Sequence, residues 1–373
     1  MGIFQTIDDE IIRAGDCTDI YFIRTEEILA AEDKNPKVTA EITVSSLPDG
    51  WGILCGLSDA LWLLEGLPID VYAMPEGSMF YPGEPVIRIV GNYRDFCRFE
   101  TSLLGFLCHA SGIASAAALI KGCAGERAVY SFGSRRQHPS IAEMIERSAW
   151  IGGVDGVSNT CAPSGLPLIG TMPHSFVMCY DNPKDSWVSF AKHAPEDVPR
   201  VMLCDTFCDE KREALSAAKR GAVAIRLDTP SSRKGDMRSI LEEVRWELDV
   251  NGFENVRLFL SGGLGAGDIL EFRDIVDAFG VGGAIANAPV VDFSLDIVEI
   301  EGKPVSKRGK KSGVKEVYEF ENGNHILLPA GAPAPENTKP MLKIFMKDGQ
   351  ILSMPDMNKS RMRVLMAIQN MTE

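Results

Sequence analysis

Apolar stretches of strand length alternate with stretches of helix length between about residues 125 and 290. An alternation of this kind predicts parallel strands that are joined by helical crossovers. The expected strands are 129–132, 165–169, 201–203, 223–227, 256–260 and 282–285, with 156–159 as a seventh candidate. The expected helices between them include 141–149, 210–219 and 236–248.

Polar side chains follow three of these strands at their carboxyl ends. Strand 129–132 leads to Arg135 and Arg136, and strand 165–169 leads to His174. Strand 223–227 has Arg226 near its carboxyl end and is followed by Asp228. Because the carboxyl ends of parallel strands meet at one edge of a sheet, we expect one shared pocket, as in a barrel enzyme. An open doubly wound sheet is the alternative, and the number of polar strand ends favours a barrel.

The distribution of these patterns predicts three domains. Residues 1–120 mix short strands with helices and are expected to form an α+β domain that ends in an apolar helix over 101–120. Residues 121–290 would form the α/β barrel. Residues 291–373 return to strand patterns, with a hairpin about Asp348-Gly349, and predict a small β-rich C-terminal domain. The first residues of the chain could pack with this last part.

Charge and cysteine content argue against several classes of protein. A net charge of −14 over 373 residues opposes nucleic-acid binding, which needs cations for the phosphates. Nine cysteines without a CxxC pair indicate free thiols in a reducing cytoplasm, without structural zinc. Residues 8–10 are acidic where a signal peptide would be basic. The uncharged segment 101–120 contains Gly105, His109 and Gly112, which favours a buried helix, interrupted near Gly112, over a membrane span.

Two glycine turns and a cation–carboxylate pair suggest a phosphorylated sugar as ligand. Residues 261–263 and 282–283 are glycine-rich and follow apolar runs, so backbone N–H groups there could approach an anion closely. Arg226 and Asp228 are two residues apart on a strand and point the same way. They would hold a phosphate and either vicinal hydroxyls or magnesium. Plain tight turns and a surface ion pair are the alternatives.

Other candidate residues have equally simple alternatives. Arg135, Arg136 and His138 could clamp an anion or form a solvated basic turn. Tyr21 lies beside an acid and could stack on a planar ligand, although most tyrosines are structural. The basic run 307–311 is typical of a solvated loop.

Taken together, the chain resembles the type II phosphoribosyltransferases, and specifically nicotinate phosphoribosyltransferase of the archaeal and bacterial kind. Each matching segment is short, but they follow one another in family order along nearly the whole chain. They are TDIY (18–21), PEGS (75–78), FGSRRQHP (132–139), IGGVDGVSN (151–159), GTMPHS (170–175), CDT (204–206), RLD (226–228), SGG (261–263) and FGVG (279–282).

The resemblance implies an α/β protein with an irregular open barrel, preceded by an α+β domain and followed by a C-terminal domain. It also implies a cytoplasmic homodimer, or a higher oligomer, with shared active sites. The ligands would be nicotinate, phosphoribosyl pyrophosphate with Mg²⁺, and ATP, and neither nucleic acid nor a membrane would be a partner.

Residue roles follow from the same resemblance. His174 matches the histidine that becomes transiently phosphorylated by ATP in family members, and it would be catalytic together with Asp228 and Arg226. Asp228 would also hold the ribose hydroxyls and lie near the magnesium. The 5′-phosphate would lie against Ser261, Gly262, Gly263, Gly282 and Gly283. The expected substrate contacts are Tyr21, Arg135, Arg136, Gln137, His138, Ser158, Thr171, Asp205 and Thr206.

The choice of pyridine rests on a few positions. Nicotinamide-using relatives place an aspartate near Ser158, where a carboxylate would repel nicotinate, so serine favours the acid. Quinolinate-using relatives need extra cations, and no matching Arg-Lys-Thr run is present. Gly283 stands where many members have a hydroxyl. Cys208 is the last cysteine, so the C-terminal zinc cluster of some archaeal relatives is not expected. A quinolinate or nicotinamide enzyme, or a silent nucleotide-binding protein, is the alternative.

Overall fold

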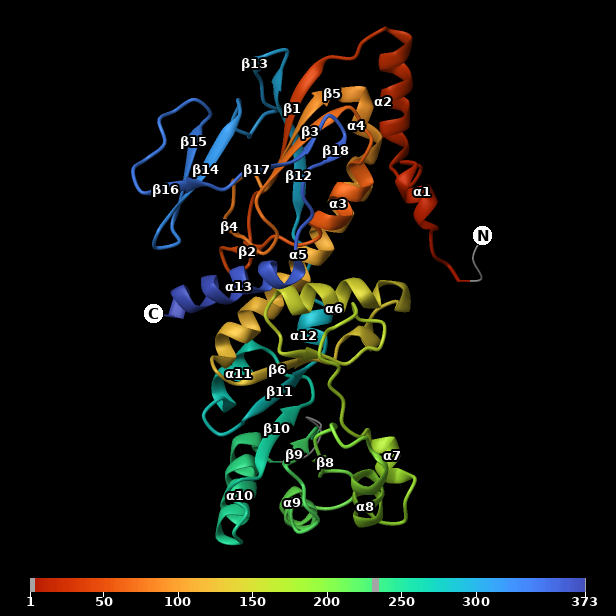
Figure 1. Ribbon diagram of the computed structural model, residues 1–373, viewed down its shortest axis with the longest axis vertical. Helices are drawn as coiled ribbons and strands as arrows, with labels where there is room; N and C mark the ends of the chain where they lie inside the picture. Colours follow the sequence, from red (N-terminus) through yellow and green to blue (C-terminus); the bar gives the residue numbers. More distant parts are fainter. Residues whose placement is uncertain (1–3, 230–234, 373) are drawn as a thin grey trace. The chain divides into compact units, whose positions relative to one another are not determined.

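A computed structural model describes residues 4–229 and 235–372 and divides into two compact units (Figure 1). Unit 1 comprises Met1–Ala118, Ile151–Gly153 and Pro289–Glu373, and unit 2 comprises Leu119–Trp150 and Val154–Ala288. The predicted boundaries near 120 and 290 therefore fall close to the borders of unit 2. The C-terminal part, however, belongs to unit 1 instead of forming a third domain.

Unit 2 contains a six-stranded sheet in the order β7-β6-β11-β10-β9-β8, and every neighbouring pair in it is parallel. The edge strands β7 and β8 leave the sheet open, which agrees with the predicted open α/β barrel. Its strands are β6 (Ala128–Ser131), β7 (Gly156–Val157), β8 (Val201–Leu203), β9 (Ala224–Leu227), β10 (Arg257–Ser261) and β11 (Ala278–Val281).

Helices separate these strands along the chain, as the alternation predicts. They are α6 (Ala142–Ile151), α7 (His174–Met178), α8 (Pro183–His193), α9 (Glu210–Ala218), α10 (Met237–Val250), α11 (Ala266–Phe272) and α12 (Gly283–Ala286). The side chain of Asp209 accepts N–H groups at the start of α9, and that of Asp236 does so at the start of α10. Ile225 on β9, Leu260 on β10 and Phe279 on β11 are buried in the core, and their burial stabilises the sheet.

Two expected strands were wrong. Residues 165–169 make only a single bridge, between Val157 and Leu168, and the seventh candidate supplies β7 instead. Pro167 has no N–H to donate, which limits strand pairing there. Residues 282–285 belong largely to helix α12, and the strand lies earlier, at β11. The apolar run from 278 to 286 has no polar residue to mark where the strand ends.

Unit 1 contains a seven-stranded sheet in the order β13-β12-β1-β5-β3-β17-β18. Strand β12 pairs with β1 and strand β17 pairs with β3, both antiparallel, so C-terminal strands satisfy the backbone groups on both sides of the β1-β5-β3 set. This pairing is why residues 291–373 do not stand apart. The strands are β1 (Lys37–Val44), β3 (Ile69–Ala73), β5 (Ile87–Asn92), β12 (Phe293–Ile300), β13 (Lys303–Pro304), β17 (Lys343–Lys347) and β18 (Gln350–Ile351).

Smaller sheets and helices complete unit 1. A three-stranded sheet has the order β15-β14-β16, and β2 pairs with β4. Their bounds are β2 (Gly52–Ile53), β4 (Met79–Phe80), β14 (Lys315–Phe320), β15 (His325–Pro329) and β16 (Thr338–Pro340). The helices are α1 (Asp9–Arg13), α2 (Ile20–Ala31), α3 (Leu57–Leu64), α4 (Tyr93–Phe96), α5 (Glu100–Ala124), which continues beyond unit 1, and α13 (Met357–Thr372). Sequence reasoning missed α13, whose first turn is capped by Asp356 accepting the N–H of Lys359 at 2.8 Å.

Helix α5 covers the expected apolar segment and continues through Gly112 without a break, so the interruption expected there was wrong. A Cβ at Gly112 would lie 2.3 Å from the carbonyl oxygen of Pro289, which explains a glycine inside a helix. The segment Tyr93–Ala124 has the length and apolar character of a membrane span, but 56% of its most apolar window is buried within the protein. Burial of this kind is typical of a core helix.

Candidate active site

Arg226, on β9, is the centre of a polar cluster at the carboxyl edge of the parallel sheet. It donates from Nε to Ser261 Oγ at 2.9 Å, from one amino group to Thr171 Oγ1 at 2.8 Å, and from the other to Asp228 Oδ2 at 2.8 Å. The guanidinium carbon lies 5.5 Å from the ring centre of Phe132. Burial lowers the pKa of Arg226, the carboxylates of Asp228 and Asp205 raise it, and the nearby charge of Arg135 lowers it.

Asp205 and Asp228 bring two carboxylates from neighbouring strand ends into the same place. The backbone N–H of Asp228 donates to Asp205 Oδ2 at 2.5 Å, and the hydroxyl of Thr229 donates to the same oxygen at 3.0 Å. The other oxygen, Oδ1, is buried and has no hydrogen-bond partner among the described residues. Burial raises the pKa of Asp205, and these two hydrogen bonds oppose that rise. Asp205 therefore has one oxygen left for a ligand.

His174 is the first residue of α7 and turns its two ring nitrogens to different partners. Nδ1 lies 3.1 Å from Thr206 Oγ1, whereas Nε2 lies 3.9 Å from Asp205 Oδ1 and 4.0 Å from Asp228 Oδ2. Its side chain is 38% exposed, so a ligand can reach it. An imidazole oriented at Nδ1, with Nε2 beside two carboxylates, can exchange a proton or accept a phosphoryl group.

The turn after β6 carries the two arginines of the expected anion clamp. Arg135 and Arg136 are exposed and lie in a 3₁₀ turn, Ser134–Arg136. The side chains of Gln137 and His138 already have hydrogen-bond partners within the protein. Gln137 Nε2 donates to the carbonyl oxygen of Ala286 at 3.1 Å, and His138 Nδ1 accepts the N–H of Ser140 at 3.2 Å. Their expected substrate contacts remain predictions. Ser158 is exposed directly after β7.

The first glycine turn follows β10 and lies against the carboxylate of Asp228. Gly262 has φ +104°, and a Cβ there would lie 2.8 Å from Asp228 Oδ1. Gly263 has φ +74° and open space around it. The second turn, at Gly282 and Gly283, begins α12 and lies close to the β6 turn, because a Cβ at Gly133 would lie 2.5 Å from the carbonyl oxygen of Gly282. The structure thus places both turns beside the cluster's strand ends.

Gly262→Ala is expected to lower kcat/KM about 100-fold, because Asp228 must move while Arg226 holds its other oxygen, and small displacements of reacting groups cost about that much. Steady-state kinetics of the variant and the wild-type protein would measure this loss in kcat/KM. Gly263→Ala is the control, since its φ of +74° is also positive, while a Cβ there would meet no atom within 4 Å. Equal losses in both variants would mean that displacement of Asp228 is not the cause.

Tyr21 belongs to unit 1, where it is the second residue of α2. Its side chain is 57% exposed, and its hydroxyl donates to Asp19 Oδ2 at 3.1 Å. The exposed ring is available to a ligand, and its stacking role remains a prediction.

Sequence reasoning missed Glu213, which shapes the loop after β8. Its carboxylate, buried on α9, accepts the backbone N–H groups of Thr206, Phe207 and Cys208 at 2.9–3.2 Å. The only signal was an acid in the first turn of a helix. Phe132 was also missed as a partner of Arg226, because nothing in its own segment indicates where an arginine will lie.

Within residues 4–229 and 235–372, no three histidine, cysteine or acidic side chains gather as a metal site. A divalent ion at Asp205 and Asp228 would therefore complete its coordination with oxygen atoms of a substrate or water.

The carboxyl edge of this parallel half-barrel gathers an arginine, two aspartates, a histidine and glycine turns, which are the groups that a phosphorylated sugar needs. Family models agree: the quinolinate phosphoribosyl transferase N-terminal domain matches residues 19–111 and the C-terminal domain matches residues 113–296. The chain belongs to this family, the type II phosphoribosyltransferases.

Individual proteins that are similar to this chain are named as nicotinate enzymes. Nicotinate phosphoribosyltransferase pncB2 of Mycobacterium tuberculosis is 30% identical over 349 residues, which cover 81% of this chain and 73% of that protein. The crystal structure of nicotinate-nucleotide pyrophosphorylase from Pyrococcus furiosus is 48% identical, covers 100% of both chains and has a TM-score of 0.97. The human nicotinic acid phosphoribosyltransferase structure, at 19% identity and a TM-score of 0.77 over 95% of this chain and 94% of that chain, shares the fold.

Proposed function

We propose that the protein is a nicotinate phosphoribosyltransferase, which joins nicotinate to phosphoribosyl pyrophosphate and yields nicotinate mononucleotide and pyrophosphate in NAD biosynthesis. The observation that carries the proposal is the Arg226–Asp228 pair, 2.8 Å apart, beside the glycine turn of residues 261–263. The names of the M. tuberculosis and P. furiosus relatives support it. We expect the enzyme to act in the cytoplasm.

Displacement at the anomeric carbon by the pyridine nitrogen passes through an oxocarbenium-like state, so the protein contributes position and charge. Asp228 would accept hydrogen bonds from the ribose hydroxyls, and Arg226 would face the developing negative charge of the leaving group. Backbone N–H groups of Gly262, Gly263, Gly282 and Gly283 would hold the 5′-phosphate. Arg135 or Arg136 would bind the nicotinate carboxylate, and Tyr21 of the partner subunit in a homodimer would stack on the ring.

Magnesium fits the two aspartates, and it would arrive with phosphoribosyl pyrophosphate. The free, buried Oδ1 of Asp205 and the carboxylate of Asp228 are hard oxygen ligands of the kind that Mg²⁺ prefers, with the remaining positions left to substrate and water. When bound, the ion would neutralise charge on the pyrophosphate. Asp205 and Asp228 would hold that ion from the protein side.

ATP coupling would run through His174. Its Nε2 would attack the γ-phosphorus of ATP, the bond to ADP would break, and water would later release phosphate from the histidine. Thr206 fixes the ring from Nδ1, so that Nε2 faces the site. The phosphohistidine would make product formation more favourable than the uncoupled reaction.

Quinolinate is the second candidate substrate, because the matching family models are those of quinolinate phosphoribosyl transferase. Its second carboxylate needs additional cations, and the sequence around 135–138 supplies two arginines and no Arg-Lys-Thr run. Ser158 leaves room for one acid group without repelling it.

Pyrophosphate release with phosphoribosyl pyrophosphate, Mg²⁺ and one pyridine at a time tests the proposal. We expect turnover on nicotinate, increased by ATP, with nicotinamide and quinolinate at least about 100-fold slower, since an unmatched charge at a carboxylate pocket costs about 3 kcal/mol. Turnover on quinolinate alone would replace nicotinate by the second candidate. No turnover on any pyridine would leave a silent nucleotide-binding protein.

A further inference from the structure

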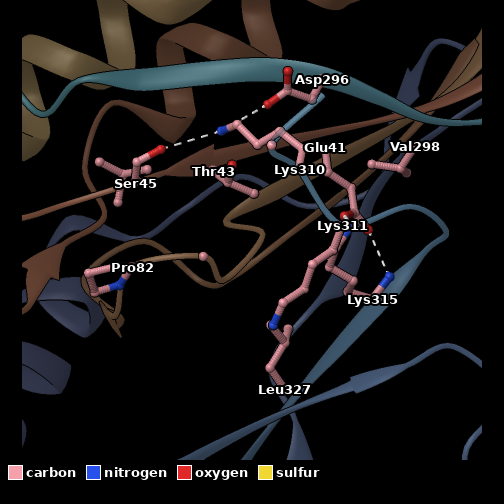
Figure 2. A pocket seen from close by; sticks show the side chains of 13 residues that line it. Glu41, Thr43, Ser45, Pro82, Asp296, Val298, Lys310, Lys311, Lys315 and Leu327 are labelled. Carbon is pink, nitrogen blue, oxygen red and sulfur yellow. Dashed lines mark hydrogen bonds and ion pairs between the residues drawn. The ribbon is translucent and has the colours of Figure 1, made fainter. Parts of the chain in front are cut away.

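A cavity in unit 1, with several charged side chains in its lining, lies among residues that the proposed reaction does not use. It has a volume of about 280 Å³, and strands β1 and β12, the loop at 309–311 and the start of β14 form its wall (Figure 2). We name it the lysine cavity, after Lys310, Lys311 and Lys315 in its lining. Two of these lysines come from the basic run 307–311, for which the reaction gives no role.

Two buried carboxylates in the wall are already neutralised by cations. Glu41 is fully buried, and its oxygens accept the Nζ of Lys315 at 2.9 Å and the backbone N–H of Lys315 at 3.0 Å. Asp296 is 7% exposed, and its oxygens lie 3.1 Å from Lys310 Nζ and 2.5 Å from Lys307 Nζ. The dashed lines in Figure 2 mark the bonds of Lys315 and Lys310. These acids therefore do not leave the cavity negative.

Lys311 adds a cation to this balanced wall. Its side chain is exposed, and it forms no hydrogen bond or ion pair within the described part of the chain. Arg88 also contacts Glu41, at 3.4 Å, but it is paired with Glu316 at 3.0 Å, so it does not change the balance. The lining itself holds three lysines and two carboxylates. An unpaired ammonium beside neutralised acids attracts anions, and it does so on a protein whose net charge is −14.

The other hydrogen-bond donors and the size of the cavity limit the class of ligand that can bind there. Ser45 Oγ lies 3.5 Å from Lys310 Nζ, and the hydroxyl of Thr43 belongs to the same lining. Ammonium and hydroxyl groups suit an oxyanion that only accepts hydrogen bonds. The volume is close to that of about nine liquid waters at ~30 Å³ each, which suits orthophosphate or pyrophosphate. Pockets that bind drug-sized ligands have volumes of roughly 300–1,000 Å³, so this cavity lies just below that range.

We propose that the lysine cavity binds a small phosphate-class oxyanion through the ammonium of Lys311 and the hydroxyl of Ser45. Lys310 adds positive charge, but its Nζ is already bonded to Asp296, Ser294 and Ser45. Binding itself does not depend on the proposed function. The source of the anion does, because the proposed reaction releases pyrophosphate and its ATP-coupled step releases orthophosphate. Either product of the proposed reaction could then bind to unit 1 in this cavity.

Isothermal titration with orthophosphate and, separately, pyrophosphate tests the proposal on the full chain. We expect two binding events in the wild-type protein, one in the lysine cavity and one at the glycine turns of unit 2. Lys311→Ala should weaken the first about tenfold, since a charge-assisted hydrogen bond at an exposed site is worth about 1.4 kcal/mol. Arg226→Ala should affect only the second.

Lys343→Ala is the matched control, because Lys343 is an exposed lysine of unit 1 outside the lining. It should leave both events and the unfolding temperature unchanged, and Lys311→Arg should restore binding. Titrations of Lys311→Ala that match those of Lys343→Ala would overturn the proposal. So would the absence of any binding event that persists in Arg226→Ala, whereas loss of only the unit 2 event would count against the proposed function. A response to one anion only would identify its source.

Discussion

Arg226→Ala is expected to lower kcat/KM for phosphoribosyl pyrophosphate at least about 1,000-fold. Loss of a single preorganised charge-stabilising donor costs about 10²–10³ in rate, and Arg226 contributes several. Its three side-chain partners, Ser261, Thr171 and Asp228, would lose their donor together. The effect is measured as pyrophosphate release over a range of substrate concentrations.

The same substitution should reduce the free energy of unfolding by about 3 kcal/mol. Breaking a buried ion pair costs roughly 3–5 kcal/mol, and the lower end applies because the Asp228 side chain is 26% exposed. Urea unfolding measures this loss. Arg226→Lys separates charge from geometry, since lysine keeps the charge but not the fork of donors.

If activity in Arg226→Lys were to equal that of the wild-type enzyme, the three-way geometry would not matter. If Arg226→Ala lost stability but kept kcat/KM, Arg226 would be a structural residue, and the assigned role would fail. Thr171→Val provides the milder comparison, because it removes one acceptor of Arg226 and leaves its bond to Asp228 intact.

The cluster could be predicted from sequence because parallel topology alone brings strand ends together. The hydrogen-bonded group brings together residues that are up to 54 positions apart in the sequence. They are Arg226 on β9, Asp228 directly after β9, Asp205 and Thr206 after β8, and His174 at the start of α7. The alternating pattern accounts for the place of Arg226 and Asp228. His174 follows a segment that forms only a single bridge, and the resemblance, not the alternation, indicated Asp205 and Thr206. Individual side-chain contacts carry no such signal, whether they are distant, as between Gln137 and Ala286, or local, as between His138 and Ser140.

Errors of prediction came from pairing over long sequence separation and from uniform apolar runs. Nothing in the segments 293–300 and 343–347 indicates that they extend the sheet of the first hundred residues, because an unpaired edge can accept any compatible strand. The run from 278 to 286 is equally apolar in its strand and in its helix. Because even the exposed Ala284 is apolar, no polar residue gives the periodicity that would separate strand from helix.

His174→Ala is expected to abolish the stimulation by ATP while leaving ATP-independent pyrophosphate release within about threefold of wild type. Alanine removes the only nitrogen that the proposal gives as phosphoryl acceptor, so nicotinate-dependent ADP formation should fall at least about 1,000-fold, the scale expected for loss of a covalent nucleophile. ADP and pyrophosphate are measured in the same reaction. The ATP-independent reaction persists because Arg226, Asp228 and the glycine turns remain in place.

Thr206→Val is the matched control for orientation, because it removes the oxygen 3.1 Å from Nδ1 and keeps the imidazole. It should reduce ADP formation about tenfold, which is the worth of one hydrogen bond of about 1.4 kcal/mol. Acid-labile phosphate on the wild-type chain after incubation with labelled ATP, and its absence in His174→Ala, would place the phosphoryl group on this residue. Undiminished ADP formation in His174→Ala would mean that ATP hydrolysis takes another route, and Nε2, 3.9–4.0 Å from two carboxylates, would then serve only to exchange protons with them.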